Sequence, residues 1–213
     1  MMPEPTSTPT AYVVDDDEAI RTLWRWLLES NGIVVQTFAT AAQFIDGYRD
    51  GRGCLVLDLR LPGMSGLELQ EYLKGEGIEI PIVFVTGHAD VPTAVSALKG
   101  GAVDFIQKPF SYREVLAVIA KAMARDAEIR EMRVQRSRVA DRLATLTGRE
   151  RGVLQCIIEG KQNKIIAAEL DISIKTVEVH RSKVMEKMAV DSVAELVQRI
   201  LGFSLMEAPG PDS

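Results

Sequence analysis

Short apolar runs alternate with amphipathic stretches over the first 110 residues of the chain. The runs are of strand length and mostly β-branched, and they cover residues 12–14, 33–35, 54–57, 82–85 and 103–106. The stretches between them space their apolar positions as helices do, and they cover residues 17–30, 40–48, 65–75 and 90–99. Nearly all-apolar strands that are separated by helices predict a parallel sheet covered on both faces. We therefore expect a doubly wound α/β fold with a five-stranded parallel sheet.

Residues 111–146 contain neither glycine nor proline, and their apolar positions recur at intervals of three and four. This pattern predicts one long helix of about 35 residues, part of which has the spacing of a coiled coil. Two arginines, Arg125 and Arg136, occupy seam positions that a coiled coil would fill with apolar side chains. Two interpretations stay open: a helix that pairs with a second copy, or a charged linker whose first half packs on the sheet.

Four shorter helical patterns follow Gly148, and they cover residues 149–159, 163–170, 174–188 and 191–201. Ser173 directly precedes the third pattern and is a suitable N-cap. The chain is therefore expected to hold an α/β domain and a small all-α domain, joined by the long helix. The expected boundaries are a disordered N-terminus over 1–10, the α/β domain over 11–125, a helical linker over 126–146, the all-α domain over 147–202 and a tail over 203–213.

The net charge of −5 is distributed unevenly along the chain. Residues 1–110 carry a net charge of −7, residues 111–146 carry +3, and residues 147–213 carry −1. Because the first domain is acidic and the last is not basic overall, any contact with DNA must come from a local basic cluster. No stretch approaches the roughly 18 consecutive apolar residues of a membrane span, and the N-terminus does not resemble a signal peptide. We expect a cytoplasmic protein without a membrane partner.

Polar side chains follow the predicted strands at the points where the strands end. Asp15 and Asp16 follow the first strand, and Asp58 follows the third; Thr86 and Lys108 follow the last two. On a doubly wound sheet whose first and third strands are neighbours, these side chains converge on one crevice. Clustered carboxylates raise one another's proton affinity unless a cation compensates, and their hard oxygens suit Mg²⁺. A carboxylate nucleophile, a metal ion, a hydroxyl and a fixed ammonium together indicate phosphoryl transfer.

The motifs VVDDDE, LVLDLRLPGMSG, VFVTGHAD and DFIQKPF resemble, in order and spacing, the receiver domains of two-component response regulators. The resemblance covers roughly residues 10–125. It implies that Asp58 accepts a phosphoryl group and that Lys108 holds one of the phosphoryl oxygens. It also implies a Mg²⁺ site whose ligands are Asp15 through water, Asp16, Asp58 and the backbone carbonyl of Arg60.

The same resemblance extends to the switch of a receiver domain. Thr86 and Phe105 match the hydroxyl and aromatic positions whose coupled movement reports phosphorylation, and the Lys108–Pro109 bond is expected to be cis. By this resemblance the domain catalyses only its own phosphorylation and dephosphorylation. We therefore do not expect a conventional enzyme.

Residues 163–188 predict a helix, a tight turn and a second helix. With LTGRERGVL, which begins at Leu146, the segments NKIIAAELDIS and KTVEVHRSKVMEKM resemble the LuxR/NarL type of DNA-binding domain over residues 146–201. The resemblance places Glu178, Val179 and Ser182 toward the bases. Further DNA contacts, mostly to phosphates, are expected on the same polar face from Ser173, Lys175, Thr176, His180, Arg181, Lys183 and Lys187.

The whole architecture resembles response regulators of the FixJ type, which implies phosphorylation-dependent control of transcription. The implied partners are a sensor histidine kinase, double-stranded promoter DNA, a second copy of the chain and, as a further candidate, RNA polymerase. Phosphorylation would favour a dimer through about residues 90–107, with the linker helix adding to pairing or to spacing.

Two rival functions use the same residues. A metal-dependent phosphatase could be built on the acidic crevice, although the sequence offers no evident second acid or base for it. A module that binds other proteins through its helices could use the second half of the chain. Turnover of phosphate esters would reveal the first, and DNA footprinting would separate the second from a direct reader of DNA.

Overall fold

The computed structural model describes residues 8–87 and 90–207, with side chains up to residue 203. The chain divides into two compact units, one up to Arg130 and one from Glu131 onward. The expected disorder at the N-terminus and the expected C-terminal tail fall largely on residues 1–7 and 208–213, which lie outside the described residues. None of the helices in the described ranges combines the length and the apolar character needed to cross a membrane.

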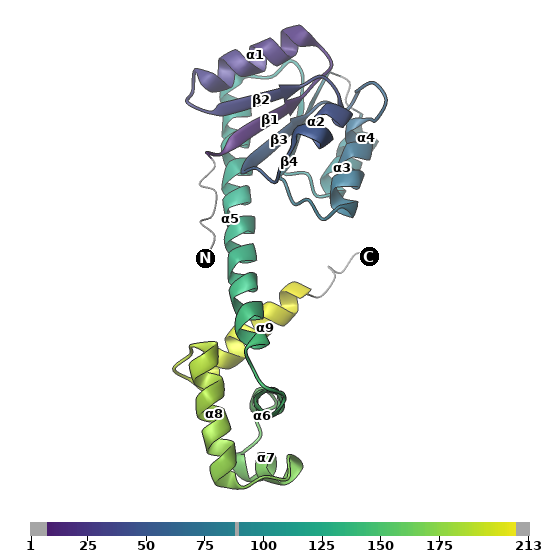
Figure 1. Cartoon of the computed structure of the whole chain (residues 1–213). Coiled ribbons are helices and arrows are strands. Elements are labelled where there is room, and N and C mark those ends of the chain that lie inside the picture. Colours follow the sequence, from purple (N-terminus) through teal and green to yellow (C-terminus); the bar gives the residue numbers. More distant parts are fainter. Residues whose placement is uncertain (1–7, 88–89, 208–213) are drawn as a thin grey trace. The chain divides into compact units, whose positions relative to one another are not determined.

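The first unit contains the predicted five-stranded parallel sheet (Figure 1). Its strands are β1 (Thr10–Val14), β2 (Val34–Phe38), β3 (Gly53–Leu57), β4 (Ile82–Thr86) and β5 (Asp104–Gln107). They are ordered β2-β1-β3-β4-β5, and every neighbouring pair is parallel. Val14 at the end of β1 pairs with Leu57 at the end of β3, so these two strands end side by side. The prediction that the first and third strands are neighbours is confirmed.

Five helices complete the elements of the first unit: α1 (Glu18–Glu29), α2 (Ala41–Gly47), α3 (Gly66–Gly75), α4 (Val91–Lys99) and the first part of α5 (Tyr112–Ala144). Successive strand residues face opposite sides of the sheet, so the sheet forms two cores. One core is closed by α1 and α5, through the side chains of Trp24, Leu27, Leu28, Val115, Ile119 and Ala122. The other is closed by α2, α3 and α4, through Phe44, Leu69, Leu73 and Ala97. Coverage on both faces explains why the buried strands read as apolar runs.

Strand β2 differs from its prediction. The apolar run predicts a strand over residues 33–35, whereas β2 covers Val34–Phe38 and includes Gln36 and Thr37. Because β2 is one of the two edge strands of the sheet, it is only partly buried and alternates exposed with half-buried positions. A strand with polar residues on its solvated side does not produce a continuous apolar run.

The second unit is all helical, as predicted. It consists of the last turns of α5 together with α6 (Gly148–Ile158), α7 (Asn163–Glu169), α8 (Ile174–Met188) and α9 (Val193–Glu207). Its core is lined by the buried side chains of Val153, Ile157, Ile166, Val177, Val184, Met188 and Leu196. Val139 and Leu143 of α5 pack against this core. Thr147 and Glu150 form a capping box that starts α6, and the Ser173 side chain caps α8 as expected.

Candidate functional site

Three of the predicted site residues meet at the carboxyl ends of the strands. Asp15 directly follows β1, Asp58 directly follows β3, and Lys108 directly follows β5. The Lys108 Nζ atom lies 2.7 Å from Asp15 Oδ2 and 3.0 Å from Asp58 Oδ2, and it donates a hydrogen bond to each. All three side chains are largely buried. The parallel topology therefore produces a compact constellation of two carboxylates and one ammonium from residues up to 93 positions apart.

Burial and charge act against each other in this pocket. Burial raises the pKa of the Asp15 carboxyl, and the hydrogen bond and charge of Lys108 offset only part of that effect. Burial works to lower the pKa of Lys108, but the hydrogen bonds and charges of Asp15 and Asp58 outweigh it and raise the pKa. Lys108 is therefore held firmly as a cation between the two carboxylates.

Hydrogen bonds that involve the backbone fix the loops that carry these carboxylates. The Arg21 guanidinium donates hydrogen bonds of 2.8 Å to the carbonyl oxygens of both Asp15 and Asp16. The Arg60 N–H donates to Asp58 Oδ1 at 3.1 Å. Helix α3 begins close to this loop, because a Cβ atom on Gly66 would lie 2.4 Å from the Asp58 carbonyl oxygen. A larger residue at that position would push α3 away from the site.

The two predicted switch residues lie on the strands next to the pocket. Thr86 ends β4 and is buried, and its carbonyl oxygen accepts the Lys108 N–H at 2.8 Å. Phe105 lies on β5 and is half-buried, with its ring centroid 6.3 Å from that of Phe84. The Lys108–Pro109 peptide bond is cis, which confirms that prediction.

The oxygen atoms at this edge of the sheet have the chemistry of a Mg²⁺ site. No group of three or more Asp, Glu, His or Cys side chains within residues 8–87 and 90–207 is arranged to hold a metal ion. Mg²⁺ in phosphoryl-transfer sites is nevertheless bound by only one or two carboxylates, with water and phosphate oxygens completing the shell. Asp58 and the exposed Asp16 supply such carboxylates, and the Arg60 peptide lies in the same loop as Asp58. The donor set therefore fits this ion.

The second unit presents the predicted helix, turn and helix as α7, residues 170–173 and α8. Glu178, Val179 and Ser182 are exposed on α8, as contact with bases would require. Lys175 and Lys183 are exposed as well, whereas the side chain of His180 is half-buried. The apolar side of α8 faces the core of the unit. The helix therefore keeps a polar face free toward solvent.

Lys187 differs from the other residues of that face. Its Nζ atom donates to a Glu150 carboxylate oxygen at 2.6 Å and to the Thr145 carbonyl at 3.0 Å. The hydrogen bond from Lys187 to the Glu150 carboxylate is the main cause that lowers the pKa of the buried Glu150 to about 2. The phosphate contact expected of Lys187 stays a prediction, and it is the one that this geometry favours least.

Two family models match the chain, one for each unit. The model described as the response regulator receiver domain matches residues 11–120, and the model for bacterial regulatory proteins of the luxR family matches residues 144–200. The chain belongs to the response regulators. Its first domain is a receiver, and its second is of the luxR family.

Curated relatives and solved structures agree with this assignment. The chain is 46% identical to the transcriptional regulatory protein FixJ of Azorhizobium caulinodans over 92% of this chain and 93% of the relative. It is 43% identical to the response regulator protein TodT of Pseudomonas putida over 88% of this chain and 83% of the relative. The solved structure of response regulator StyR matches with a TM-score of 0.81 and 45% identity, covering 92% of this chain and 99% of that one.

The receiver also contains a buried ion pair that the sequence did not lead us to expect. Asp126 on α5 is 3% exposed, and its carboxylate accepts the Gly53 N–H at the start of β3 at 3.0 Å. Arg130 Nε donates to the same carboxylate at 3.0 and 3.1 Å, and its Nη2 donates to the Gly51 carbonyl at 2.7 Å. An acidic and a basic residue four positions apart usually form an exposed pair on a helix, so the spacing alone gave no sign of burial.

Proposed function

We propose that this response regulator is phosphorylated on Asp58 and that the phosphorylated form controls transcription by binding promoter DNA. The observation that carries the proposal is the placement of Lys108 Nζ within hydrogen-bond distance of both Asp15 and Asp58. Such a constellation combines a nucleophilic carboxylate with a fixed cation that neutralises charge on a transferred phosphoryl group. A sensor histidine kinase is the expected donor, and the cytoplasm is the expected compartment.

The chemistry follows from the groups at the strand ends. An Asp58 carboxylate oxygen attacks the phosphorus atom of a phosphohistidine, the P–N bond breaks, and the released histidine nitrogen takes up a proton. The product is an acyl phosphate on Asp58, which water later hydrolyses. Lys108 donates to a phosphoryl oxygen in place of its present bond to Asp58. Mg²⁺, held by Asp16, Asp58 and the Arg60 carbonyl with Asp15 acting through water, would neutralise the oxygens of the transferred group.

The response to phosphorylation is assigned to Thr86 and Phe105. The Thr86 hydroxyl would bind a phosphoryl oxygen, and Phe105 would follow it inward from its half-buried position on β5. Dimerisation is assigned to about residues 90–107, where Val91, Val95 and Leu98 are exposed on α4. Val91 is 76% exposed, which is unusual for a large apolar side chain and suits a surface that becomes covered.

DNA binding is assigned to α8. Glu178, Val179 and Ser182 would face the bases, because all three are exposed and lie within about one turn of one another on α8. The remaining contacts would be to phosphates, chiefly from Lys175 and Lys183, which are exposed. A dimer would place two such helices on a two-fold operator, with RNA polymerase as a further candidate partner.

Phosphorylation is tested by labelling with a phosphodonor in the presence of Mg²⁺. Asp58→Asn should abolish the labelling, whereas Asp46→Asn, an exposed residue on α2, should leave it intact. Intact protein mass would record the added phosphoryl group. Full labelling of Asp58→Asn would overturn the assignment of the acceptor.

DNA binding is tested by gel shift with a set of duplexes that differ in sequence. Lys183→Ala should weaken binding to all duplexes alike and reduce its salt dependence, because it removes a phosphate contact. Glu178→Ala should change which duplexes bind. Light scattering with and without a phosphoryl mimic tests the dimer, and a chain that stays monomeric in both states and on DNA would refute it.

A further inference from the structure

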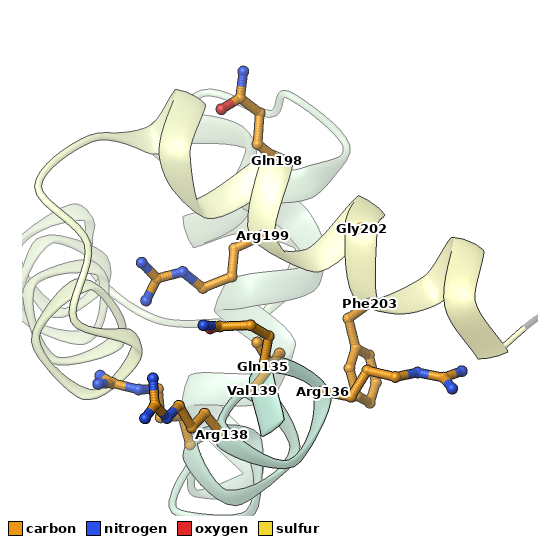
Figure 2. A pocket seen from close by; sticks show the side chains of 9 residues that line it. Gln135, Arg136, Arg138, Val139, Gln198, Arg199, Gly202 and Phe203 are labelled. Atoms are coloured by element: carbon orange, nitrogen blue, oxygen red, sulfur yellow. The ribbon is translucent and has the colours of Figure 1, made fainter. Parts of the chain in front are cut away.

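A cationic pocket of about 390 Å³ lies between the last turns of α5 and α9 in the second unit (Figure 2). Its walls carry Arg136, Arg138, Arg142 and Arg199 together with the apolar side chains of Val139 and Phe203. No aspartate or glutamate is among the residues that line it. The volume is within the range of roughly 300–1,000 Å³ that is typical of small-molecule sites.

Two of the arginines are held in place by the end of α8. Arg142 Nη1 donates to the Lys187 carbonyl at 3.4 Å, and Arg199 Nη1 donates to the Met188 carbonyl at 2.7 Å. Arg199 Nη2 also donates to Glu195 at 2.8 Å. Each guanidinium has five N–H donors, so both retain donors that these bonds do not use.

The other two arginines are not engaged in this way. The side chains of Arg136 and Arg138 form no hydrogen bond or ion pair with residues 8–87 and 90–207. Figure 2 shows the guanidinium groups of Arg138 and Arg199 extending toward one side of the pocket, with Arg136 and Phe203 at its other end. The pocket therefore has one end rich in free N–H donors and another formed by an aromatic ring and a planar cation.

We propose that this pocket binds a nucleoside polyphosphate. Arg138, Arg142 and Arg199 bind the phosphates, because guanidinium groups form short, charge-assisted hydrogen bonds to phosphate oxygens. Phe203 and Arg136 contact the base, since both present flat surfaces on which an aromatic ring stacks. A DNA backbone would use the cations but would leave the apolar end of the pocket without a role.

The position of the pocket in the sequence separates it from the DNA-reading helices. The luxR-family match ends at residue 200 and begins at residue 144, whereas Arg136, Arg138 and Arg142 precede it and Phe203 follows it. Most of the pocket is thus formed by residues outside the matched segment, whereas Gln198 and Arg199 lie at its end. This inference goes beyond the proposed function and does not depend on it.

Isothermal titration calorimetry on the full chain tests the proposal, with ATP, AMP and pyrophosphate as probes and with EDTA present so that the acidic pocket contributes no metal. We expect ATP to bind more tightly than AMP and more tightly than pyrophosphate. Arg138→Ala should weaken ATP binding about tenfold or more, the equivalent of one hydrogen bond to a charged group. Arg113→Ala, which removes an exposed arginine from the receiver part of α5, is the matched control and should leave the affinity unchanged.

Absence of ATP binding at millimolar concentration would overturn the proposal, and so would equal affinities of Arg138→Ala and the control. Pyrophosphate binding as tightly as ATP would overturn the assignment of the base to Phe203. If ATP does not bind and Arg138→Ala instead weakens binding to duplex DNA, the arginines serve the DNA backbone and the proposal is wrong. Circular dichroism of each variant shows that the fold is retained.

Discussion

The buried ion pair between Asp126 and Arg130 joins α5 to the start of β3, and its removal gives a sharp test of how the receiver is stabilised. Asp126→Ala leaves the Gly53 N–H without its acceptor and Arg130 without its carboxylate. Removing one partner of a buried pair costs roughly 3–5 kcal/mol. The Arg130 side chain is 23% exposed and retains some hydration, which favours the lower end of that range. We therefore expect the free energy of unfolding of the receiver to fall by about 3 kcal/mol.

Urea unfolding followed by tryptophan fluorescence measures this change in the receiver alone. The chain has two tryptophans, Trp24 and Trp26, and both lie on α1. With an m-value of about 1–3 kcal/mol per molar urea, the midpoint should fall by roughly 1–3 M. Asp141→Ala removes an exposed aspartate from the same helix and should change the free energy of unfolding by less than about 0.5 kcal/mol.

A midpoint for Asp126→Ala that equals the Asp141→Ala control would refute the reasoning. That result would mean that the attraction between Asp126 and Arg130 only offsets the cost of removing them from water. The Gly53 N–H would then have to find another acceptor. If Asp126→Ala changed the m-value but not the midpoint, the result would instead indicate a different unfolded state.

Three further predictions concern single residues. Because a hydrogen bond from Lys187 holds the pKa of Glu150 at about 2, below its ordinary 4.5, the second domain should lose stability as the pH falls from 4.5 toward 2. Glu150→Gln should remove this pH dependence from the unfolding transition of the second domain. That domain contains no tryptophan, so its transition is separate from the one that tryptophan fluorescence follows. Gly53→Ala should destabilise the receiver by about 2–3 kcal/mol in the urea assay. Gly53 has a φ of 130°, and an added Cβ would lie 1.9 Å from the Thr10 carbonyl oxygen. An unchanged midpoint would contradict this prediction. Lys108→Ala should slow labelling by a phosphodonor about 100-fold or more, and an unchanged rate would remove Lys108 from the proposed chemistry.

The fold could be predicted because burial on both faces makes the central strands apolar without interruption. The runs that became β1, β3 and β4 lie at the centre of the sheet, and all five residues of each are buried. The edge strand β2 was misplaced by the same criterion, since one of its sides is solvated. The carboxylate and ammonium positions followed from topology, because parallel strands bring their carboxyl ends to one edge.

Other parts of the structure depend on packing that a linear pattern does not encode. Asp126 lies on a stretch of helix with many charged residues, and only the approach of the Gly53 N–H makes its carboxylate a buried acceptor. Lys187 was indistinguishable in sequence from the exposed Lys183 of the same helix. Its partner Glu150 lies 37 positions away and faces it only after α6 has packed against α8. Arg21 likewise reaches the Asp15 carbonyl only once α1 has folded over the end of β1.

The side chains of α5 bear on the two interpretations of the long helix. A coiled coil needs its seam positions free for a second helix. Among the apolar residues of α5 that recur at intervals of three and four and would form this seam, Val115 and Ala122 are buried in the receiver core, and Val139 packs against the core of the second domain. Arg125 and Met132 are exposed seam residues between these ends, and one of them is charged. Pairing along the whole helix would therefore require side chains to leave both cores. The loss of free energy from those cores exceeds the stabilisation that a few contacts between the remaining seam residues would provide. The packing of α5 favours a linker, so a dimer is expected to depend on another surface, for which the exposed apolar side of α4 is the candidate.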